Sequence, residues 1–352
     1  MLRPSRLEPI FSPRPWGARS LAPYFPEKTN LAEPLGEAWL TGSECLFTNG
    51  PFAGQKLGEV WPQMSAEWAG TEVAADGPFP LLLKFIFAED KLSVQVHPDD
   101  AYARAHEKLP SGEIARGKTE MWYAVEARPG AEVLAGLKEN VTRESFARAI
   151  TAGTAEECLV HVPMKKGDAI FVPAGTAHTI GAGLVLCEIQ EHSDLTYRVY
   201  DYNRRDAQGR ARELHIEKAL DVMRFGKQLG GKLTPAKVAR DGMDETFFVA
   251  CRYFATEKWE FAAGATETTT PQHFELLIIL AGRGEISWNG GRDAFGPVQV
   301  WLLPAALGKY ELAATEPVSL LRTYVPKDPL DFARRARDHG VDSATASRLV
   351  FP

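Results

Sequence analysis

The segment LSVQVHPDD, Leu92 to Asp100, carries an amide and an imidazole two residues apart. Apolar and polar residues alternate along it, which is typical of a β-strand with one apolar and one polar face. Gln95 and His97 end the polar face, directly before a Pro-Asp-Asp turn. The question is whether this face meets bulk water or lines a cavity in which the amide and imidazole hold a ligand.

A second histidine lies in the sharpest local pattern of the chain, GDAIFVPAGTAHTIG. In this pattern Gly167 is followed by Pro173, Gly175 and His178, and the predicted strand 169–172 leads into a tight turn. The spacing resembles the second signature motif of the cupin fold, in which the histidine projects into the mouth of a small β-barrel. We therefore predict that His178 faces a barrel interior.

If Gln95 and His97 face the same interior, a carboxylate should complete the set. Glu120, at the head of the apolar strand in GKTEMWYAVEA, supplies one, with Lys118 on the same face two positions earlier. Alone, His97 is more typical of an ordinary strand-end histidine; together with Glu120 and His178 it indicates a metal ligand. Two imidazoles, a carboxylate and an amide oxygen form a mixed site suited to Zn²⁺ or another first-row divalent ion, with room for water or substrate.

The elements that must position these residues are mostly short strands. Seven segments separated by Gly, Pro and Asp turns indicate an antiparallel barrel or sandwich: PLLLKFIF, KLSVQVHP, EMWYAVEA, AEVLAGL, CLVHVPM, AIFVPAG and LVLCEIQE. Two helices interrupt them. One follows a capping Thr142 and stops at Gly153, and the other is expected over residues 212–226.

The second part of the chain repeats the strand pattern at domain scale. Residues 226–242 are rich in Gly and Lys, which predicts a linker. Strand patterns resume after it, and a helix from Pro329 to before Gly340 closes the chain. The turn in FGPVQVWLLPAALGKYE keeps Pro304 but lacks the following glycine and histidine, so we expect no metal there.

These observations predict a mainly β protein of two cupin-like antiparallel β-barrels of the jelly-roll type with a few added helices. A chain of 352 residues is long for one domain. Residues 1–235 would form the metal-binding catalytic domain with helical insertions. Residues 236–352 would form a second cupin-like β domain that lacks metal ligands and ends in a helix.

The composition limits the classes of molecule that the protein is expected to bind. The 40 Lys and Arg against 46 Asp and Glu give a net charge of −6 without long runs of one sign, so neither nucleic acid nor a membrane surface is an expected partner. The four cysteines form no C-x-x-C pair, which argues against a disulfide framework or a thiolate zinc site. The proline-containing N-terminus lacks the apolar core of a signal peptide, and we expect a cytoplasmic protein.

Four segments carry a resemblance to a known family: KFIFAEDKLSVQVHPDD, KTEMWY, PAGTAHTIGAG and CEIQEHSDLTYRVYDYNR. The residues of these segments, and the order of the segments along the chain, resemble type I phosphomannose isomerase, a zinc-dependent family of the cupin superfamily. The resemblance covers roughly residues 10–225. GEAWLTG and the PWG segment around Trp16 are similar to the family's N-terminal part. The resemblance implies one Zn²⁺ per chain bound by Gln95, His97, Glu120 and His178, and a catalytic arginine at Arg198.

The resemblance also implies the reaction, interconversion of mannose 6-phosphate and fructose 6-phosphate through a cis-enediol. Its implied catalytic residues are Arg198, Lys118 and Glu188, the last as acid/base, and its substrate-binding residues are Lys118, Arg198, Lys84 and Trp16. Whether Lys118 or Arg198 holds the phosphate stays open. So do the alternatives that Glu188 faces solvent, that Lys84 reaches a sheet edge, and that Arg198 is a surface arginine paired with Asp194 or Asp201.

Two other functions are compatible with the pattern. A non-catalytic two-barrel cupin could bind or sense sugar phosphates, and a metal-dependent cupin oxygenase could use a similar site, although the amide at Gln95 disfavours redox chemistry. The expected partner is a small-molecule sugar phosphate, and the expected state is a monomer or weak homodimer. Five further histidines are predicted to be structural or exposed: His106, His161, His192, His215 and His339.

Overall fold

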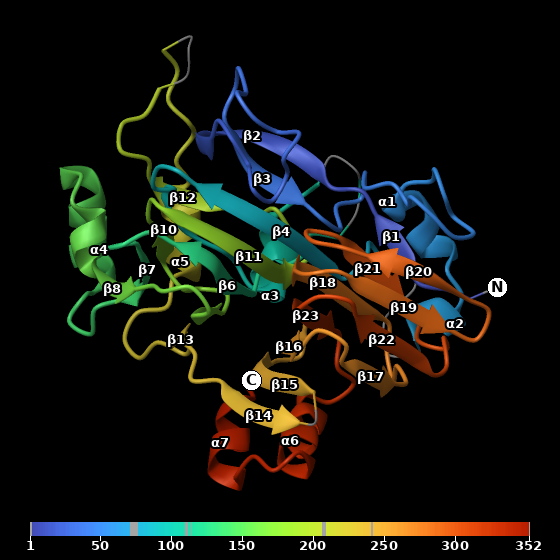
Figure 1. The fold of residues 1–352 in the computed structure, drawn as a ribbon. Helices are drawn as coiled ribbons and strands as arrows, with labels where there is room; N and C mark the ends of the chain where they lie inside the picture. Colours follow the sequence, from blue (N-terminus) through green and yellow to red (C-terminus); the bar gives the residue numbers. More distant parts are fainter. Residues whose placement is uncertain are drawn as a thin grey trace. The chain divides into compact units, whose positions relative to one another are not determined.

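Short strands make up most of the regular structure in the computed structural model, which describes residues 2–70, 77–109, 112, 114–205, 209–240 and 242–351 (Figure 1). The chain forms two compact units. The central unit comprises Phe11–Trp39 and Leu82–Leu233, and the terminal unit comprises Met1–Ile10, Leu40–Leu81 and Thr234–Pro352. The fold is mainly β, as the sequence predicts.

Two sheets build the central unit. The seven-stranded sheet contains, in spatial order, β13 (Gly231–Lys232), β9 (Ala169–Val172), β6 (Glu120–Ala127), β11 (Leu184–Glu191), β4 (Leu81–Ala88), β3 (Leu35–Trp39) and β2 (Ile10–Ala18). The five-stranded sheet contains β12 (Tyr197–Tyr200), β5 (Val94–Val96), β10 (His178–Ile180), β7 (Glu132–Leu137) and β8 (Leu159–Pro163). The unit's helical segments are α3 (Asp100–His106), α4 (Arg143–Ala152), the 3₁₀ turn Ala155–Cys158 and α5 (Ile216–Val222).

Two further sheets build the terminal unit. The seven-stranded one contains β1 (Ser5–Leu7), β21 (Val300–Leu303), β18 (Glu275–Ala281), β23 (Val318–Tyr324), β16 (Ala255–Phe261), β15 (Met243–Ala250) and β14 (Ala236–Arg240). The four-stranded one contains β17 (Thr266–Thr269), β22 (Tyr310–Ala314), β19 (Gly284–Trp288) and β20 (Gly291–Phe295). Its helical segments are α1 (Leu57–Val60), the 3₁₀ turn Trp61–Gln63, α2 (Ala66–Ala69), α6 (Pro329–Asp338) and α7 (Ser343–Arg348).

The seven predicted strands correspond to β4, β5, β6, β7, β8, β9 and β11. The first predicted helix is α4, where Thr142 and Ser145 form a capping box and Gly153 ends the helix at φ +75°. The second helix, α5, is shorter than predicted because it begins after His215 rather than at Arg212. None of the described helices is long and apolar enough to cross a membrane.

The linker prediction for residues 226–242 is wrong in part. Backbone groups of β13 pair with β9, and those of β14 pair with β15, so much of the segment belongs to the two sheets. The compact units also differ from a division at residue 235. Residues 1–10 and 40–81 join the terminal unit because β1 pairs with β21 and Trp61 packs against Phe274. The functional roles assigned to residues 1–235 and 236–352 stay predictions.

The two sheets of the central unit pack face to face around a shared apolar core. Trp122 on β6 and Ile86 on β4 meet Val133 on β7 and Ile180 on β10. On the other face of the five-stranded sheet, Val94 and Val96 of β5 pack in a second core with side chains from α4 and α5. Because side chains alternate along a strand, the residue between the two valines points into the space between the sheets.

A glycine in the turn between β9 and β10 connects this turn to the residue after β5 and to the segment after α5. The Gly175 N–H donates to the carbonyl of His97 over 2.8 Å, and its own carbonyl accepts from Arg224 N–H over 2.8 Å. Its φ of +83° is strained for other residues, and a Cβ there would lie 2.9 Å from the Val222 carbonyl oxygen. The sharp turn therefore requires glycine at this position.

We expect Gly175→Ala to lower the free energy of unfolding by about 1–3 kcal/mol, because it combines an unfavourable φ with a steric clash. Gly167→Ala is the matched control, since its φ is +90° but a Cβ there meets nothing within 4 Å. Urea unfolding measures both variants. Equal losses would show that the close approach to Val222 contributes nothing.

Candidate active site

One row of side chains crosses three neighbouring strands of the five-stranded sheet. Gln95 on β5 lies opposite His178 on β10 and opposite Arg198 on β12. Since Val94 and Val96 belong to the core on the helix side, this row faces the space between the sheets. His97 follows one residue after the end of β5. The polar face of LSVQVHPDD therefore turns inward.

A second group projects from the inner face of the opposite sheet. Glu120 begins β6 and has the same alternation as Trp122 in the shared core. Lys84 on β4 and Glu188 on β11 have the same alternation as Ile86 and Leu186, which also belong to that core. Both sheets thus direct polar residues into one end of an otherwise apolar interior.

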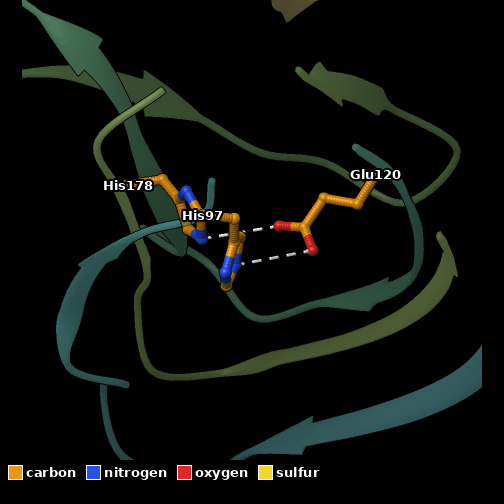
Figure 2. Close-up of side chains that lie close together, drawn as sticks. All are labelled: His97, Glu120 and His178. Atoms are coloured by element: carbon orange, nitrogen blue, oxygen red, sulfur yellow. Dashed lines mark ion pairs between the residues drawn. The ribbon is translucent and has the colours of Figure 1, made fainter. Parts of the chain in front are cut away.

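The two histidines and Glu120 converge. The Nε2 atoms of His97 and His178 lie 3.8 and 3.4 Å from the two oxygens of the Glu120 carboxylate, and the two rings are 4.8 Å apart (Figure 2). The candidate ligand atoms of these three buried residues all lie within 4.8 Å of one another. Among the described residues, this is the single group of three or more His, Cys, Asp or Glu that could hold a metal ion.

The hydrogen bonds of the histidines fix which nitrogen faces the cluster. His97 Nδ1 donates to the Leu195 carbonyl over 2.7 Å, and His178 Nδ1 donates to the Thr176 carbonyl over 2.9 Å. Each Nε2 therefore carries its lone pair toward Glu120. Burial lowers the pKa of His97 well below its usual value and that of His178 to about 4, so both rings are neutral at pH 7.

In this cluster, polar atoms without a hydrogen-bond partner are suited to bind a cation. In the described part of the chain, His97 Nε2 and Glu120 Oε1 are buried and make no hydrogen bond. Leaving such atoms unpaired costs roughly 1–3 kcal/mol each. Neutral imidazoles and a carboxylate are the donor types that bind Zn²⁺ and other first-row divalent ions. The residues present thus fit a resident metal.

Gln95 lies beside this cluster. Its Nε2 is 3.3 Å from His178 Nε2, and its Oε1 accepts from Ser93 Oγ over 3.3 Å. A half-turn of the terminal amide exchanges the oxygen and nitrogen positions and places the oxygen toward the histidines. A fourth-ligand role for Gln95 requires that orientation and stays a prediction.

Glu188 and two lysines form a second buried group next to the cluster. Glu188 Oε1 lies 3.6 Å from Lys84 Nζ and 3.8 Å from Lys118 Nζ, while its Oε2 accepts from Trp122 Nε1 over 3.0 Å. Lys118 Nζ is also 3.0 Å from Glu120 Oε2. Burial raises the pKa of Glu188, and the two lysines oppose this increase.

The alternatives left open by the sequence are decided for two positions. Glu188 is 3% exposed and Lys84 is 2% exposed, so neither faces solvent or reaches a sheet edge. Lys84 is held by Glu188, by Asp194 at 3.4 Å and by the face of Trp39. Both side chains are therefore part of the interior polar group.

An open cavity of about 480 Å³ adjoins these groups. The predicted site residues on its wall are Trp16, Lys84, Gln95, Lys118, Glu188 and Arg198. Trp16 is 3% exposed and mostly packed in the shared core, so only a small part of its ring area faces the cavity. His97, Glu120 and His178 are buried and are not among the residues that line this cavity, but Gln95 contacts His178 and Lys118 contacts Glu120.

Arg198 is half-buried on this wall. Its Nε donates to Ser93 Oγ over 3.1 Å and its Nη1 to the Glu213 carbonyl over 3.2 Å. Asp201, proposed above as a surface partner, is instead engaged by Arg204 and Arg212, and Asp194 is engaged by Lys84. Burial and the neighbouring Arg212 lower the pKa of Arg198 from its usual value. Its guanidinium thus faces the cavity without a carboxylate partner among the described residues.

Some wall residues were not predicted from the sequence. Arg14, Arg212 and His215 all line the cavity, although His215 was expected to be structural or exposed. The signal for Arg14 is its position two residues before Trp16 on β2, since alternation places both side chains on one face. Arg212 and His215 lie between elements, where no periodic pattern reports the direction of a side chain.

Comparison with known proteins identifies the family. Residues 5–136 match the family described as phosphomannose isomerase type I, catalytic domain, and residues 244–324 match the mannose-6-phosphate isomerase cupin domain. A mannose-6-phosphate isomerase of Streptococcus mutans is 37% identical over 291 residues, which cover 82% of this chain and 88% of that protein. The chain belongs to the type I phosphomannose isomerase family. The resemblance drawn from the sequence motifs is confirmed.

Other family members extend the match along the chain. Mannose-6-phosphate isomerase ManA of Bacillus subtilis is 34% identical over 313 residues, 88% of this chain and 95% of that protein. A crystal structure of the mannose 6-phosphate isomerase from B. subtilis superposes with a TM-score of 0.82 at 30% identity, over 92% of this chain and 99% of that one. A phosphomannose isomerase structure from Salmonella typhimurium, at 16% identity and a TM-score of 0.70, shares the fold.

We expect His97→Ala to lose the bound metal, because the variant lacks one of the two imidazole nitrogens that face Glu120. His161→Ala is the matched control, since this exposed histidine pairs with Glu132 on the surface. Metal content per chain after dialysis measures both. Retention of a full metal equivalent by folded His97→Ala would remove His97 from the ligand set.

Proposed function

We propose that this chain interconverts mannose 6-phosphate and fructose 6-phosphate at the cavity of the central unit. The observation that supports this most is the buried His97, Glu120 and His178 cluster beside a cavity lined with cationic side chains, in a member of this isomerase family. The reaction needs the open-chain sugar, removal of the proton at C2 and its return to C1 through a cis-enediol. Its main barrier is the negative charge that develops on the C1 and C2 oxygens.

The proposed resident metal is one Zn²⁺ per chain, held by His97, Glu120 and His178 with Gln95 as fourth ligand. When bound, it would polarise the sugar oxygens as a Lewis acid and so stabilise the developing charge. The chain prepares this site by keeping both imidazoles neutral and by fixing their Nε2 atoms toward Glu120. Lys118 holds the Glu120 carboxylate from the cavity side.

Glu188 is the proposed group that moves the proton. Its Oε1 is buried and makes no hydrogen bond among the described residues, whereas Oε2 is fixed by Trp122. The orientation of the carboxylate is thus set while one oxygen stays available to the substrate. The raised pKa of this carboxyl brings it closer to the pH at which an acid/base group both accepts and returns a proton.

Arg198 is the proposed stabiliser of the developing oxygen charge. A guanidinium remains protonated and can donate two parallel hydrogen bonds, and its place opposite Gln95 puts it beside the proposed metal ligands. Lys84 and Lys118 would bind the sugar hydroxyls and keep Glu188 oriented. Trp16 would close the wall of the substrate site.

The finer architecture is also part of this proposal. We infer that the paired sheets of each unit close into cupin-like barrels of the jelly-roll type, since residues 244–324 match a cupin domain and two sheets pack around one core in each unit. In the cell the enzyme would act in the cytoplasm on a small sugar phosphate as a monomer or weak homodimer. Neither nucleic acid nor membrane is a proposed partner.

Chelation tests the metal requirement. We expect turnover of mannose 6-phosphate to fall to background after chelator treatment and to return when about one equivalent of Zn²⁺ per chain is added. A coupled assay for fructose 6-phosphate, run with and without oxygen, measures this and separates isomerisation from oxygenase chemistry. Full activity in a chelated, metal-free preparation would contradict the proposal, and no turnover with metal present would favour the non-catalytic alternative.

Arg198→Ala tests the role of the guanidinium. We expect a folded variant with its metal retained and kcat/KM for mannose 6-phosphate reduced on the order of 10²-fold or more, about 3 kcal/mol. Arg198→Lys should recover only part of the loss, because an ammonium keeps the charge without the bidentate contact. Arg128→Ala, which removes an exposed arginine paired with Glu89, is the control. Near-wild-type kinetics in Arg198→Ala would refute its catalytic role.

A further inference from the structure

The charged side chains around the cavity form two sets, which differ in their balance of positive and negative charges. The first set surrounds the metal cluster, where two lysines, Lys84 and Lys118, are matched by the carboxylates of Glu120, Glu188 and Asp194. Every lysine charge there already has a carboxylate within 4 Å. Without the proposed metal, the side chains of this set offer no excess of positive charge to an anionic substrate group.

The second set consists of arginines and does have an excess. Arg14, Arg198 and Arg212 line the cavity, and Arg204 joins them through Asp201. Their carboxylate partners are Glu37, which pairs with Arg14, Asp201, which Arg204 and Arg212 share, and Asp90, which lies 3.7 Å from Arg204. Four guanidinium groups therefore face three carboxylates, which leaves one positive charge in excess. A phosphate monoester carries about −1.5 to −2 at pH 7.

Arg212 is held so that part of its guanidinium stays available. Its Nε donates to Asp201 Oδ2 over 2.7 Å and its Nη2 pairs with Asp201 Oδ1. This two-point contact fixes the plane of the guanidinium, and among the described residues Nη1 has no partner. Asp201 is 6% exposed and is also held by Arg204, so the brace itself is rigid.

Arg14 is also held by a carboxylate, which comes from another part of the chain. Its Nη2 donates to Glu37 over 2.8 Å, and Glu37 is fixed in turn by Trp39 Nε1 over 2.8 Å. The neighbouring strand leaves space for it only because Gly36 has no side chain, as a Cβ there would lie 2.5 Å from Arg14 Cβ. Arg14 and Arg212 also line a second open cavity of about 380 Å³, which marks them as the boundary of the catalytic cavity.

We propose that Arg14 and Arg212, braced by Glu37 and Asp201, bind the phosphate group of the substrate, while Lys84 and Lys118 serve the sugar end. This inference rests on the proposed function. In it, neither Lys118 nor Arg198 is the main residue that binds the phosphate. Guanidinium groups suit the task because they donate paired hydrogen bonds to phosphate oxygens. Binding the phosphate away from the reacting carbons positions the sugar and contributes to turnover as well as affinity.

The test compares Arg212→Ala with wild-type enzyme, both loaded with metal. We expect kcat/KM for mannose 6-phosphate to fall at least about 30-fold, and the inhibition constant of inorganic phosphate to rise by a similar factor, as is usual when one partner of a close charge pair is removed. Arg14→Ala should change both values in the same direction. Arg212→Lys should give intermediate values, and metal content should stay unchanged in all three.

Arg205→Ala is the matched control, because Arg205 lines only the second cavity and donates to the Gly209 carbonyl. It should leave both constants within about twofold of wild type. Equal effects in Arg205→Ala and Arg212→Ala would overturn the inference, because they would indicate general electrostatic attraction rather than a phosphate subsite. Unchanged constants in Arg212→Ala, with active wild type, would overturn it as well.

Calorimetric titration with inorganic phosphate separates this inference from the proposed function. If wild type does not convert mannose 6-phosphate, the proposed function fails, yet loss of phosphate binding in Arg212→Ala and Arg14→Ala still supports the subsite. If either variant does not fold, the other measures the same subsite from a different strand or loop. Phosphate binding that is equally strong in wild type and every folded variant would overturn the assignment.

Discussion

The buried carboxylate of Glu120 is the constraint on which the site depends. A charged group without solvent exposure is costly unless neighbouring groups compensate it, and the chain provides Lys118, whose Nζ lies 3.0 Å from Glu120 Oε2. Because the Nδ1 atoms of both histidines donate to backbone carbonyls, their Nε2 lone pairs face the carboxylate rather than relieve its charge. Only a cation between the two Nε2 atoms and the Glu120 carboxylate satisfies all three groups. Lys118 compensates the carboxylate alone.

Much of this arrangement follows from alternation along strands, which is readable in the sequence. Once Val94 and Val96 are assigned to an apolar face, Gln95 must point the other way, and the same rule places Glu120 with Trp122. The turn at Gly175 specifies where His178 emerges. Local rules of this kind predicted the strands, the helix after Thr142 and the three residues that converge.

Contacts between distant segments could not be predicted in this way. The pairing of Arg198 with Gln95, rather than with a residue one position away, depends on the register between two strands that the sequence does not encode locally. Arg212 is placed by a salt bridge to Asp201, and His215 by the start of a short helix. Gly231–Lys232 and Ala236–Arg240 form strands because partners in both sheets satisfy their backbone groups, although the composition of this segment indicates a linker.

The terminal unit shows what the same architecture does when its inner charges are balanced. Glu257, Glu275 and Arg322 share the alternation of the apolar residues in that unit's core, so they too point between two sheets. Arg322 donates to both glutamates, a second guanidinium, that of Arg335, pairs with Glu257, and Tyr310 donates to Glu275 over 2.7 Å.

In that network a fixed guanidinium occupies the place between carboxylates, and Glu275 raises the pKa of Arg322 despite its burial. Such a set has no need of an external cation. In the central unit, by contrast, neutral imidazoles replace the guanidinium and leave lone pairs directed at a carboxylate. The chemical difference between two similar pairs of sheets thus reduces to whether the chain itself neutralises the inner carboxylates or leaves a place for a cation, such as the proposed metal.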